Sequence, residues 1–337
     1  MNKLNAIKKY LHDIEYTYIE IDNDKSVNKI YELLINNKEE ILENDIECLY
    51  YGVYYNINKN YDLMKKYYLM AIDKGNHNVM NNLGNYYKNV EKNYDEMKKY
   101  FLMAIEKGNG ISMNSLGYYY QHIEKDFKLM KKYYLMAIEN NNSNAMNNLG
   151  NYYQNIEKKN ILMKKYYLMA IENNNSNAMN NLGYYYQHVE NNYDLMKKYY
   201  LMAIENNNID AMLNLGYYYQ NIEKKNILMK KYYLMAIENN NIKAMIFLGK
   251  YYEKEKDYKE AINIYEKLIE LNNSEGYNLI MFIFNDIYKD YKKVIYYYEK
   301  AKENNIKINY NEELIEKIRK KIIEEDLNLY EYLIQNI

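Results

Sequence analysis

The chain has 337 residues, 48% of them hydrophobic and 27% charged, and its 45 Lys and Arg balance 46 Asp and Glu. A net charge of −1 argues against a surface built to attract nucleic acid or a membrane. The single cysteine, Cys48, excludes an intrachain disulfide and fits a reducing compartment.

Residues 1–45 do not share the pattern that follows them. Val27, Ile30, Leu34 and Ile41 lie at helical spacing, so we expect an N-terminal helical cap over residues 1–45. Residues 1–20 lack the apolar core of a signal peptide, and no apolar run is long enough to span a bilayer. We therefore expect a cytoplasmic protein without a membrane segment.

From residue 46 onward, one sequence unit recurs every 33 residues. A Leu-Gly pair keeps the same interval as the segment MKKYYLMAI, in which Phe101 once replaces Tyr. This segment starts at Met64, Met97, Met130, Met163, Met196 and Met229. Self-similarity at such a period is typical of solenoids. The sequence predicts an all-α fold, an α-α solenoid, with about eight helix pairs in a superhelical array over residues 46–305.

Residues 143–175 illustrate one unit, whose two predicted helices we name helix A and helix B. Helix A is expected to be capped by Ser143 or Asn144. Its apolar stripe, at intervals of three and four, comprises Ala145, Leu149, Tyr152, Tyr153 and Ile156. After a polar connection over residues 157–160, the facing stripe of helix B comprises Met163, Tyr166, Tyr167, Ala170 and Ile171. Lys164 and Lys165 fall on the opposite side of helix B.

Two positions support this reading of the unit. Gly150 lies within helix A, where glycine costs roughly 1 kcal/mol relative to alanine, so its recurrence indicates a close helix crossing. At the end of helix B, Gly75 and Gly108 are replaced in later units by Asn. Both residue types tolerate the left-handed conformation of a C-cap.

Beyond residue 250 the units diverge but keep their period. Residues 258–270 read as a seventh helix B, and residues 275–285 with 291–303 read as an eighth pair. Asn311 then precedes Glu312, Glu313 and an apolar stripe, as expected for a capped helix. We expect residues 306–337 to form C-terminal capping helices, which a solenoid needs to cover its last exposed core.

The units resemble Sel1-like repeats, a branch of the tetratricopeptide superfamily. Ala145, Leu149, Gly150 and Tyr153 match the family's helix A pattern. The helix B pattern is matched by Asp62, Tyr67, Tyr68, Ala71, Gly75 and Asn76. The family's glycine-rich loop is missing, and Ile171 stands where a second alanine is usual. The Asn- and Tyr-rich copies also resemble repeat proteins of giant DNA viruses that infect amoebae, which implies a viral source and a location in the host cytoplasm.

The recurrent side chains have ordinary structural readings that compete with functional ones. Paired Tyr at helical spacing is usually core packing, although it is also a possible stacking surface. The Lys pairs form either a solvated face or a phosphate grip, and neighbouring Glu residues favour the solvated face.

No set of residues has the spacing of a catalytic or metal site. His122 and His188 are 66 residues apart without a recurring partner, and His12, His77 and Cys48 have no partner at catalytic spacing. We therefore expect no enzyme activity, no cofactor and no metal.

The resemblance implies that helix A lines a concave groove, and the polar and aromatic positions outside its apolar stripe are the candidate protein-binding residues. Amides and aromatic rings suit an extended peptide, although duplication alone also explains their recurrence. The candidates are Asn114, Tyr118, Gln121, His122, Asn147, Asn151, Gln154, Asn155, Asn180, Tyr184, Gln187, His188, Tyr217 and Gln220.

These residues lead to two binding hypotheses, beside a third, an enzyme regulator or a purely structural spacer, which the sequence does not separate from the first of them. The first is a non-enzymatic interaction scaffold that binds a protein or peptide partner along the concave helix-A face. The second is a single-stranded nucleic-acid binder that stacks bases on Tyr, which the balanced charge disfavours.

Overall fold

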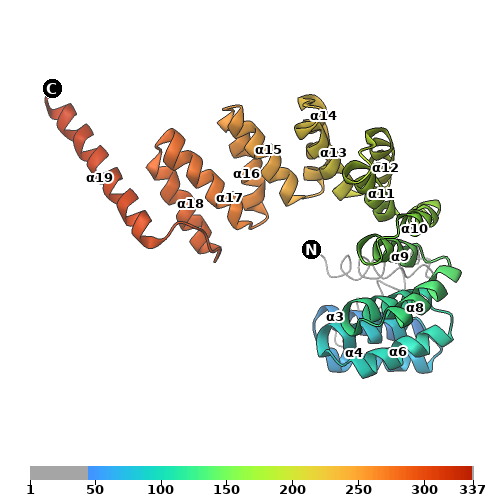
Figure 1. Cartoon of the computed structure of the whole chain (residues 1–337). Helices are drawn as coiled ribbons and strands as arrows, with labels where there is room; N and C mark the ends of the chain where they lie inside the picture. Colours follow the sequence, from blue (N-terminus) through green and yellow to red (C-terminus); the bar gives the residue numbers. More distant parts are fainter. Residues whose placement is uncertain (1–44, 336–337) are drawn as a thin grey trace. The chain divides into compact units, whose positions relative to one another are not determined.

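The computed structural model describes residues 45–335, and the predicted N-terminal cap over residues 1–45 lies almost wholly outside them. The described residues contain α-helices, three π-helical turns and no strand. Figure 1 shows antiparallel helices following one another in pairs. The predicted all-α, α-α solenoid class is confirmed.

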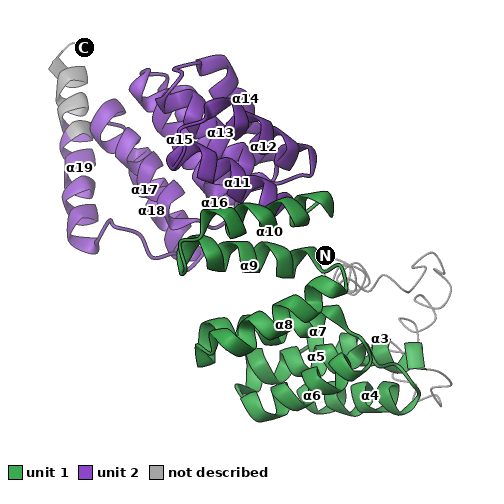
Figure 2. Ribbon diagram, turned by 45° about the vertical axis from the view of Figure 1, so that its right-hand side comes forward, with its two compact units in different colours: residues 1–175 green, residues 176–337 purple. Residues whose placement is uncertain are grey.

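The helices fall into two compact units, residues 1–175 and 176–337 (Figure 2). The first unit contains four pairs, which are α3 (Asp45–Ile57) with α4 (Tyr61–Asp73), α5 (Val79–Tyr86) and η1 (Tyr87–Glu91) with α6 (Tyr94–Glu106), α7 (Gly110–Tyr119) and η2 (Tyr120–Glu124) with α8 (Phe127–Glu139), and α9 (Ser143–Asn155) with α10 (Asn160–Glu172).

The second unit contains four further pairs and a last helix. The pairs are α11 (Ser176–His188) with α12 (Tyr193–Glu205), α13 (Ile209–Asn221) with α14 (Asn226–Glu238), α15 (Ile242–Lys254) with α16 (Tyr258–Glu270), and α17 (Ser274–Phe282) and η3 (Ile283–Tyr288) with α18 (Tyr291–Glu303). The described pairs thus number eight, as the repeat count predicts, and α16 and α18 have the predicted bounds.

The helix ends follow the predicted chemistry with one shift in position. The cap of α9 is Asn142, whose Oδ1 accepts from the backbone N–H of Ala145, and neither Ser143 nor Asn144 takes this role. Asn142 has the extended backbone that an N-cap requires, whereas Ser143 already lies inside the helix. Past the end of helix B, Gly75 and Asn174 have positive φ, which confirms the predicted left-handed C-cap.

The core is a continuous set of side chains between the helices of each pair. In the fourth pair Ala145, Leu149 and Tyr152 of α9 and Met163 of α10 are buried, as their stripes predict. Ile156 is exposed, contrary to the predicted stripe, because the chain leaves helical geometry at that residue.

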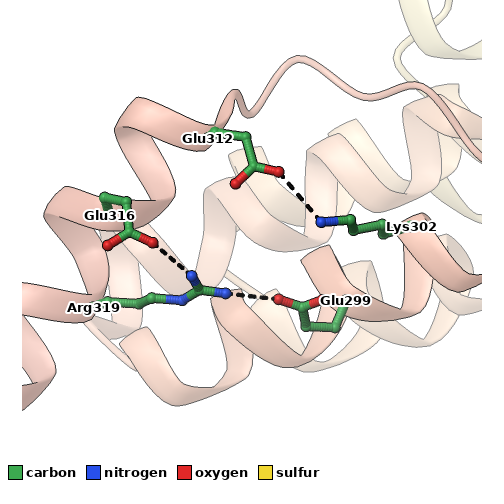
Figure 3. A network of polar contacts seen from close by, with 5 residues as sticks. All are labelled: Glu299, Lys302, Glu312, Glu316 and Arg319. Carbon is green, nitrogen blue, oxygen red and sulfur yellow. Dashed lines mark hydrogen bonds and ion pairs between the residues drawn. The ribbon is translucent and has the colours of Figure 1, made fainter.

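The last helix, α19 (Glu312–Gln335), packs against α18. Asn311 Oδ1 accepts from the N–H of Leu314, and Ile315 and Ile318 are buried. Figure 3 shows the polar contacts beside this apolar seam, where Arg319 bridges Glu316 and Glu299, and Lys302 pairs with Glu312. The division of the chain into a cap, a repeat array and a second cap stays a prediction.

Candidate functional site

Each regular helix pair is organised around a tyrosine of helix B that packs on a glycine of helix A. In the fourth pair, a Cβ added to Gly150 would lie 2.6 Å from Cδ1 of Tyr167. The same contact joins Gly117 to Tyr134 in the third pair. The predicted close crossing is therefore present, and the tyrosine ring fills the space that the missing side chain leaves.

The hydroxyl of this tyrosine reaches a glutamine four residues after the glycine. The Tyr167 hydroxyl lies 2.6 Å from Oε1 of Gln154 and 2.6 Å from Oδ1 of Asn151, and its single proton is donated to one of these two oxygens at a time. The bond recurs between Tyr134 and Gln121 at 2.8 Å, Tyr200 and Gln187 at 2.9 Å, and Tyr233 and Gln220 at 2.7 Å. Burial raises the pKa of each of these phenols, so the hydroxyl stays a donor.

The four predicted glutamines consequently have a structural role in their own pair. Gln187 is only 8% exposed. Because the carbonyl end of each amide is engaged with helix B, its NH₂ group is the end left for other contacts.

Two of the predicted asparagines of helix A, Asn114 and Asn180, bond to the helix A of the next pair. Asn148 Nδ2 donates to Oδ1 of Asn114 at 3.0 Å, and Asn214 Nδ2 donates to Oδ1 of Asn180 at the same distance. Asn147 is buried. These amides therefore contribute to the stacking of repeats.

The exposed residues of this face include aromatic rings as well as the amide of Asn155. Tyr118, Tyr184 and Tyr217, at one repeat position, are 41%, 47% and 46% exposed. Tyr118 contacts His122 with ring centroids 4.1 Å apart, and Tyr184 contacts His188 at 4.2 Å. Both histidines are exposed. We use the term helix-A face, for each unit by itself, for the repeat positions that the fourteen predicted residues occupy.

The predicted residues divide between the two units. Asn114, Tyr118, Gln121, His122, Asn147, Asn151, Gln154 and Asn155 belong to the first unit, and Asn180, Tyr184, Gln187, His188, Tyr217 and Gln220 to the second. Phe247 was not predicted but contacts Tyr217 at 6.1 Å between ring centroids. Its repeat position carries Asn in other units, so periodicity gave no signal for it.

The opposite face holds a bridge between successive pairs, which we call the lysine staple. The first lysine of MKKYY reaches forward to the glutamate after the next helix A, and that glutamate also accepts from a tyrosine of the same helix A. Lys65 lies 3.0 Å from Glu91, which accepts from Tyr86 at 2.6 Å. The other staples are Lys98 with Glu124 and Tyr119, Lys131 with Glu157 and Tyr152, and Lys197 with Glu223 and Tyr218.

These contacts change the acidity of the glutamates. Hydrogen bonds from Lys131, Lys159 and Tyr152 lower the pKa of Glu157 to about 2. Glu223 has the same arrangement and a pKa of about 2. In these four staples the first lysine of the MKKYY segment is thus bound between repeats, whereas the second lysine of a segment, such as Lys132 or Lys165, is exposed. Only the second lysines fit the predicted solvated face.

The staple is replaced between the seventh and eighth pairs. Ile262 stands at the lysine position of α16 and Tyr288 at the glutamate position after η3. A hollow of about 600 Å³ lies there, lined by Lys259, Ile262, Phe284, Tyr288, Lys293 and Tyr297, among others. Lys293 already covers the Phe284 ring at 4.6 Å, and Tyr297 donates to Glu266 at 3.0 Å.

Among the residues whose side chains the structure describes, no group of three or more His, Cys, Asp or Glu is placed to hold a metal ion. Cys48 is buried, and burial raises the pKa of its thiol. None of the described helices is long and apolar enough to cross a membrane.

Paired helices of near-constant length, joined by a repeated glycine–tyrosine crossing, define an α-α solenoid of short repeats. The Sel1 repeat pattern matches more than half of the chain, and the protein belongs to the Sel1 repeat family. The matched residues are 47–76, 78–109, 110–142, 143–160, 176–208, 209–226, 242–273 and 284–306.

Two solved structures share this fold. The protective antigen c5321 of uropathogenic Escherichia coli strains, described as displaying an SLR fold, is 20% identical with a TM-score of 0.52. That alignment covers 82% of this chain and 64% of the antigen, so the chain spans less than two thirds of that protein. A Sel1 repeat protein from Oxalobacter formigenes is 24% identical with a TM-score of 0.51, over 66% of this chain and 98% of its own. No curated protein sequence matches the chain.

Proposed function

We propose that the chain is a non-enzymatic scaffold that binds a protein or peptide partner along the helix-A face. Sel1 repeat proteins are generally protein-interaction scaffolds, which supports the general role. The observation that supports this face is the exposure of Tyr118, Tyr184 and Tyr217, each above 40%. Rigid aromatic side chains of this kind often dominate the binding energy of interfaces.

The hydrogen bonds of this face favour recognition by aromatic rings with amide support. The glutamines and several asparagines hold the repeats in place, so they fix the positions of the tyrosines between them. A preorganised surface loses less conformational entropy when it binds. The viral source and the cytoplasmic location stay predictions.

A pull-down from a lysate of the native host tests the proposal. The variant replaces Tyr118, Tyr184 and Tyr217 by Ala, and the matched control replaces Leu135, Leu168 and Leu201, which are 41–42% exposed on helix B. We expect the Tyr variant to lose the partners that the wild type and the Leu control retain. Exposed substitutions change stability by only about half a kcal/mol each, so both variants should fold.

Two further pull-down experiments distinguish protein partners from nucleic-acid partners. Nuclease treatment should leave the capture unchanged, as should replacement of the exposed Lys132, Lys165 and Lys198 by Ala. If the Tyr variant retains its partners, the helix-A face is not the binding surface. Partners that depend on nuclease-sensitive material and on these lysines would instead establish the nucleic-acid alternative.

A further inference from the structure

One helix pair departs from the glycine–tyrosine–glutamine arrangement at two positions together. In the second pair Phe101 replaces the helix-B tyrosine, and Lys88 replaces the helix-A glutamine. A Cβ on Gly84 would still lie 2.4 Å from Cδ1 of Phe101, so the ring crossing is kept. Phe101 has no hydroxyl to donate, and position 88 is therefore released from the contact that holds Gln154 in the fourth pair.

Lys88 instead turns toward the next helix A. Its Nζ lies 4.9 Å from the ring centroid of Tyr118, and the Tyr118 ring contacts His122 at 4.1 Å. Lys88 is half-buried, while Tyr118 and His122 are exposed. We name Lys88, Tyr118 and His122 the Lys88 cluster, which combines an ammonium, an imidazole and an aromatic ring at one place on the helix-A face.

The positive charge of this cluster lacks a partner of opposite sign. Among the described residues, no carboxylate forms an ion pair or hydrogen bond with Lys88 or His122, and Glu91 and Glu124 are held in staples by Lys65 and Lys98. Burial and the nearby Lys92 lower the pKa of Lys88.

The charged groups that act on the His122 imidazole are likewise positive. Burial, Lys125 and Lys88 lower the pKa of His122. A partly buried ammonium without a counter-charge is unfavourable in the free protein, and a bound anion would relieve this cost.

We propose that the Lys88 cluster binds a carboxylate side chain of the partner peptide, an inference that rests on the proposed function of the helix-A face. Lys88 supplies the charge, an imidazole N–H of His122 donates a hydrogen bond, and Tyr118 packs against the neighbouring part of the peptide. Charge-assisted hydrogen bonds of this type are about twice as strong as neutral ones.

The surroundings favour a single carboxylate over a phosphate backbone. Asn85 lies one helical turn before Lys88, and Asn114 lies one helical turn before Tyr118. In the next helix A, Asn151 has the repeat position of Tyr118, and all three asparagines are neutral. A polynucleotide places a charge at every residue and is held by a row of cations. The cluster itself contains one lysine, with Lys92 and Lys125 adding positive charge near it, and tetrauridylate therefore serves as the probe for a phosphate backbone.

Histidine NMR of the full chain tests the inference without the native partner. The chain contains four His, so ¹³Cε1-labelled histidine gives few signals, and His122→Gln assigns the relevant one. The probes are the peptide acetyl-Ala-Glu-Tyr-Ala-amide, the same peptide with Gln in place of Glu, and tetrauridylate. We expect the Glu peptide to shift the His122 resonance at a concentration about tenfold lower than the Gln peptide requires, the factor that a single charged hydrogen bond contributes.

The chain supplies two matched controls. His188 has the same repeat position as His122. The helix A before His122 contributes Lys88, whereas the helix A before His188 has Gln154 at the same repeat position. His188 should therefore not distinguish the Glu peptide from the Gln peptide. The double variant Lys88→Gln with Phe101→Tyr restores the residue pair of the regular repeats and should keep the circular dichroism spectrum. In this variant the preference of His122 for the Glu peptide should disappear.

Three results would overturn the inference. They are an equal response of His122 to the Glu and Gln peptides, a Glu preference that persists in the double variant, and a response to tetrauridylate alone. The pull-down with the Tyr variant can give its expected result when this titration fails, so a failure of this inference is distinguishable from a failure of the proposed function.

Discussion

The hydroxyl of Tyr200 donates a 2.9 Å hydrogen bond to Oε1 of Gln187, and both side chains are almost completely removed from solvent. The bond joins α12 to α11 directly beside the crossing of Tyr200 over Gly183. One polar contact is thereby built into an otherwise apolar seam, and an unmatched donor or acceptor there carries a desolvation cost.

We predict that Tyr200→Phe lowers the free energy of unfolding by about 1–2 kcal/mol, because Oε1 of Gln187 loses its donor. Gln187→Leu should have a similar effect. The double variant should be more stable than the sum of the two losses implies, since neither polar group then remains. Urea unfolding followed by circular dichroism measures the three values, and strict additivity would contradict this coupling.

For Gly150 we predict that substitution destabilises the protein although it raises helix propensity. A Cβ would lie 2.6 Å from the Tyr167 ring, and overpacking of a core costs about 1–3 kcal/mol. Gly150→Leu should lower the melting temperature more than Gly150→Ala. The control is Lys165→Ala on the exposed side of α10, which should be nearly neutral. An unchanged melting temperature for Gly150→Leu would mean that the crossing can open without cost.

Acid should weaken the lysine staples over the pH range in which their glutamates bind protons in the unfolded chain but not yet in the folded protein. The folded-state pKa of Glu157 is about 2, below the ordinary value of 4.5, so its stabilising contribution is complete above the ordinary value. This contribution is lost as the pH falls from about 4.5 toward 2. A series of melting temperatures should show a smaller decline in this window for Glu157→Gln with Glu223→Gln than for the wild type. Parallel declines would show that other carboxylates dominate the acid response.

The two lysines of each MKKYY segment should respond differently to substitution. Lys131 is bound to Glu157 and lies 5.2 Å from the Tyr152 ring centroid, whereas Lys132 is exposed. Lys131→Ala should lower the melting temperature, and Lys132→Ala should change it little. Equal effects would place the staple among the surface ion pairs that contribute nothing measurable.

The architecture could be predicted from the sequence because its signals act within one repeat. The intervals of three and four residues define helix faces, and the period of 33 residues defines the pair. Residues 258–270 and 291–303 are helices with the expected ends even where the copies diverge. The recurrent glycine indicated the crossing, and a tyrosine ring of helix B occupies it.

Contacts between different helices were the part that periodicity did not reveal. Lys131 and Lys132 are neighbouring residues of the same type, so the sequence does not distinguish them. In the structure Glu157 of the following repeat binds Lys131, whereas Lys132 is exposed. Gln154 was predicted as a groove-lining residue that binds a partner, but the Tyr167 hydroxyl of helix B bonds to its side-chain oxygen. The second pair replaces both partners of this contact together, with Phe101 at the tyrosine position and Lys88 at the glutamine position. This joint replacement indicates the hydrogen bond only to a reader who already knows that the two positions are in contact.

The lysine staple also bears on how such an array grows. A copy with both staple residues presents a lysine to the copy after it and a glutamate to the copy before it, as Lys98 and Glu91 do for the second pair. A duplicated segment of one repeat therefore carries both halves of the connection and joins its neighbours on either side without compensating substitutions. Lengthening of the gene by whole repeats is consequently compatible with folding at each step, whereas an insertion of any other length would separate a lysine from its glutamate.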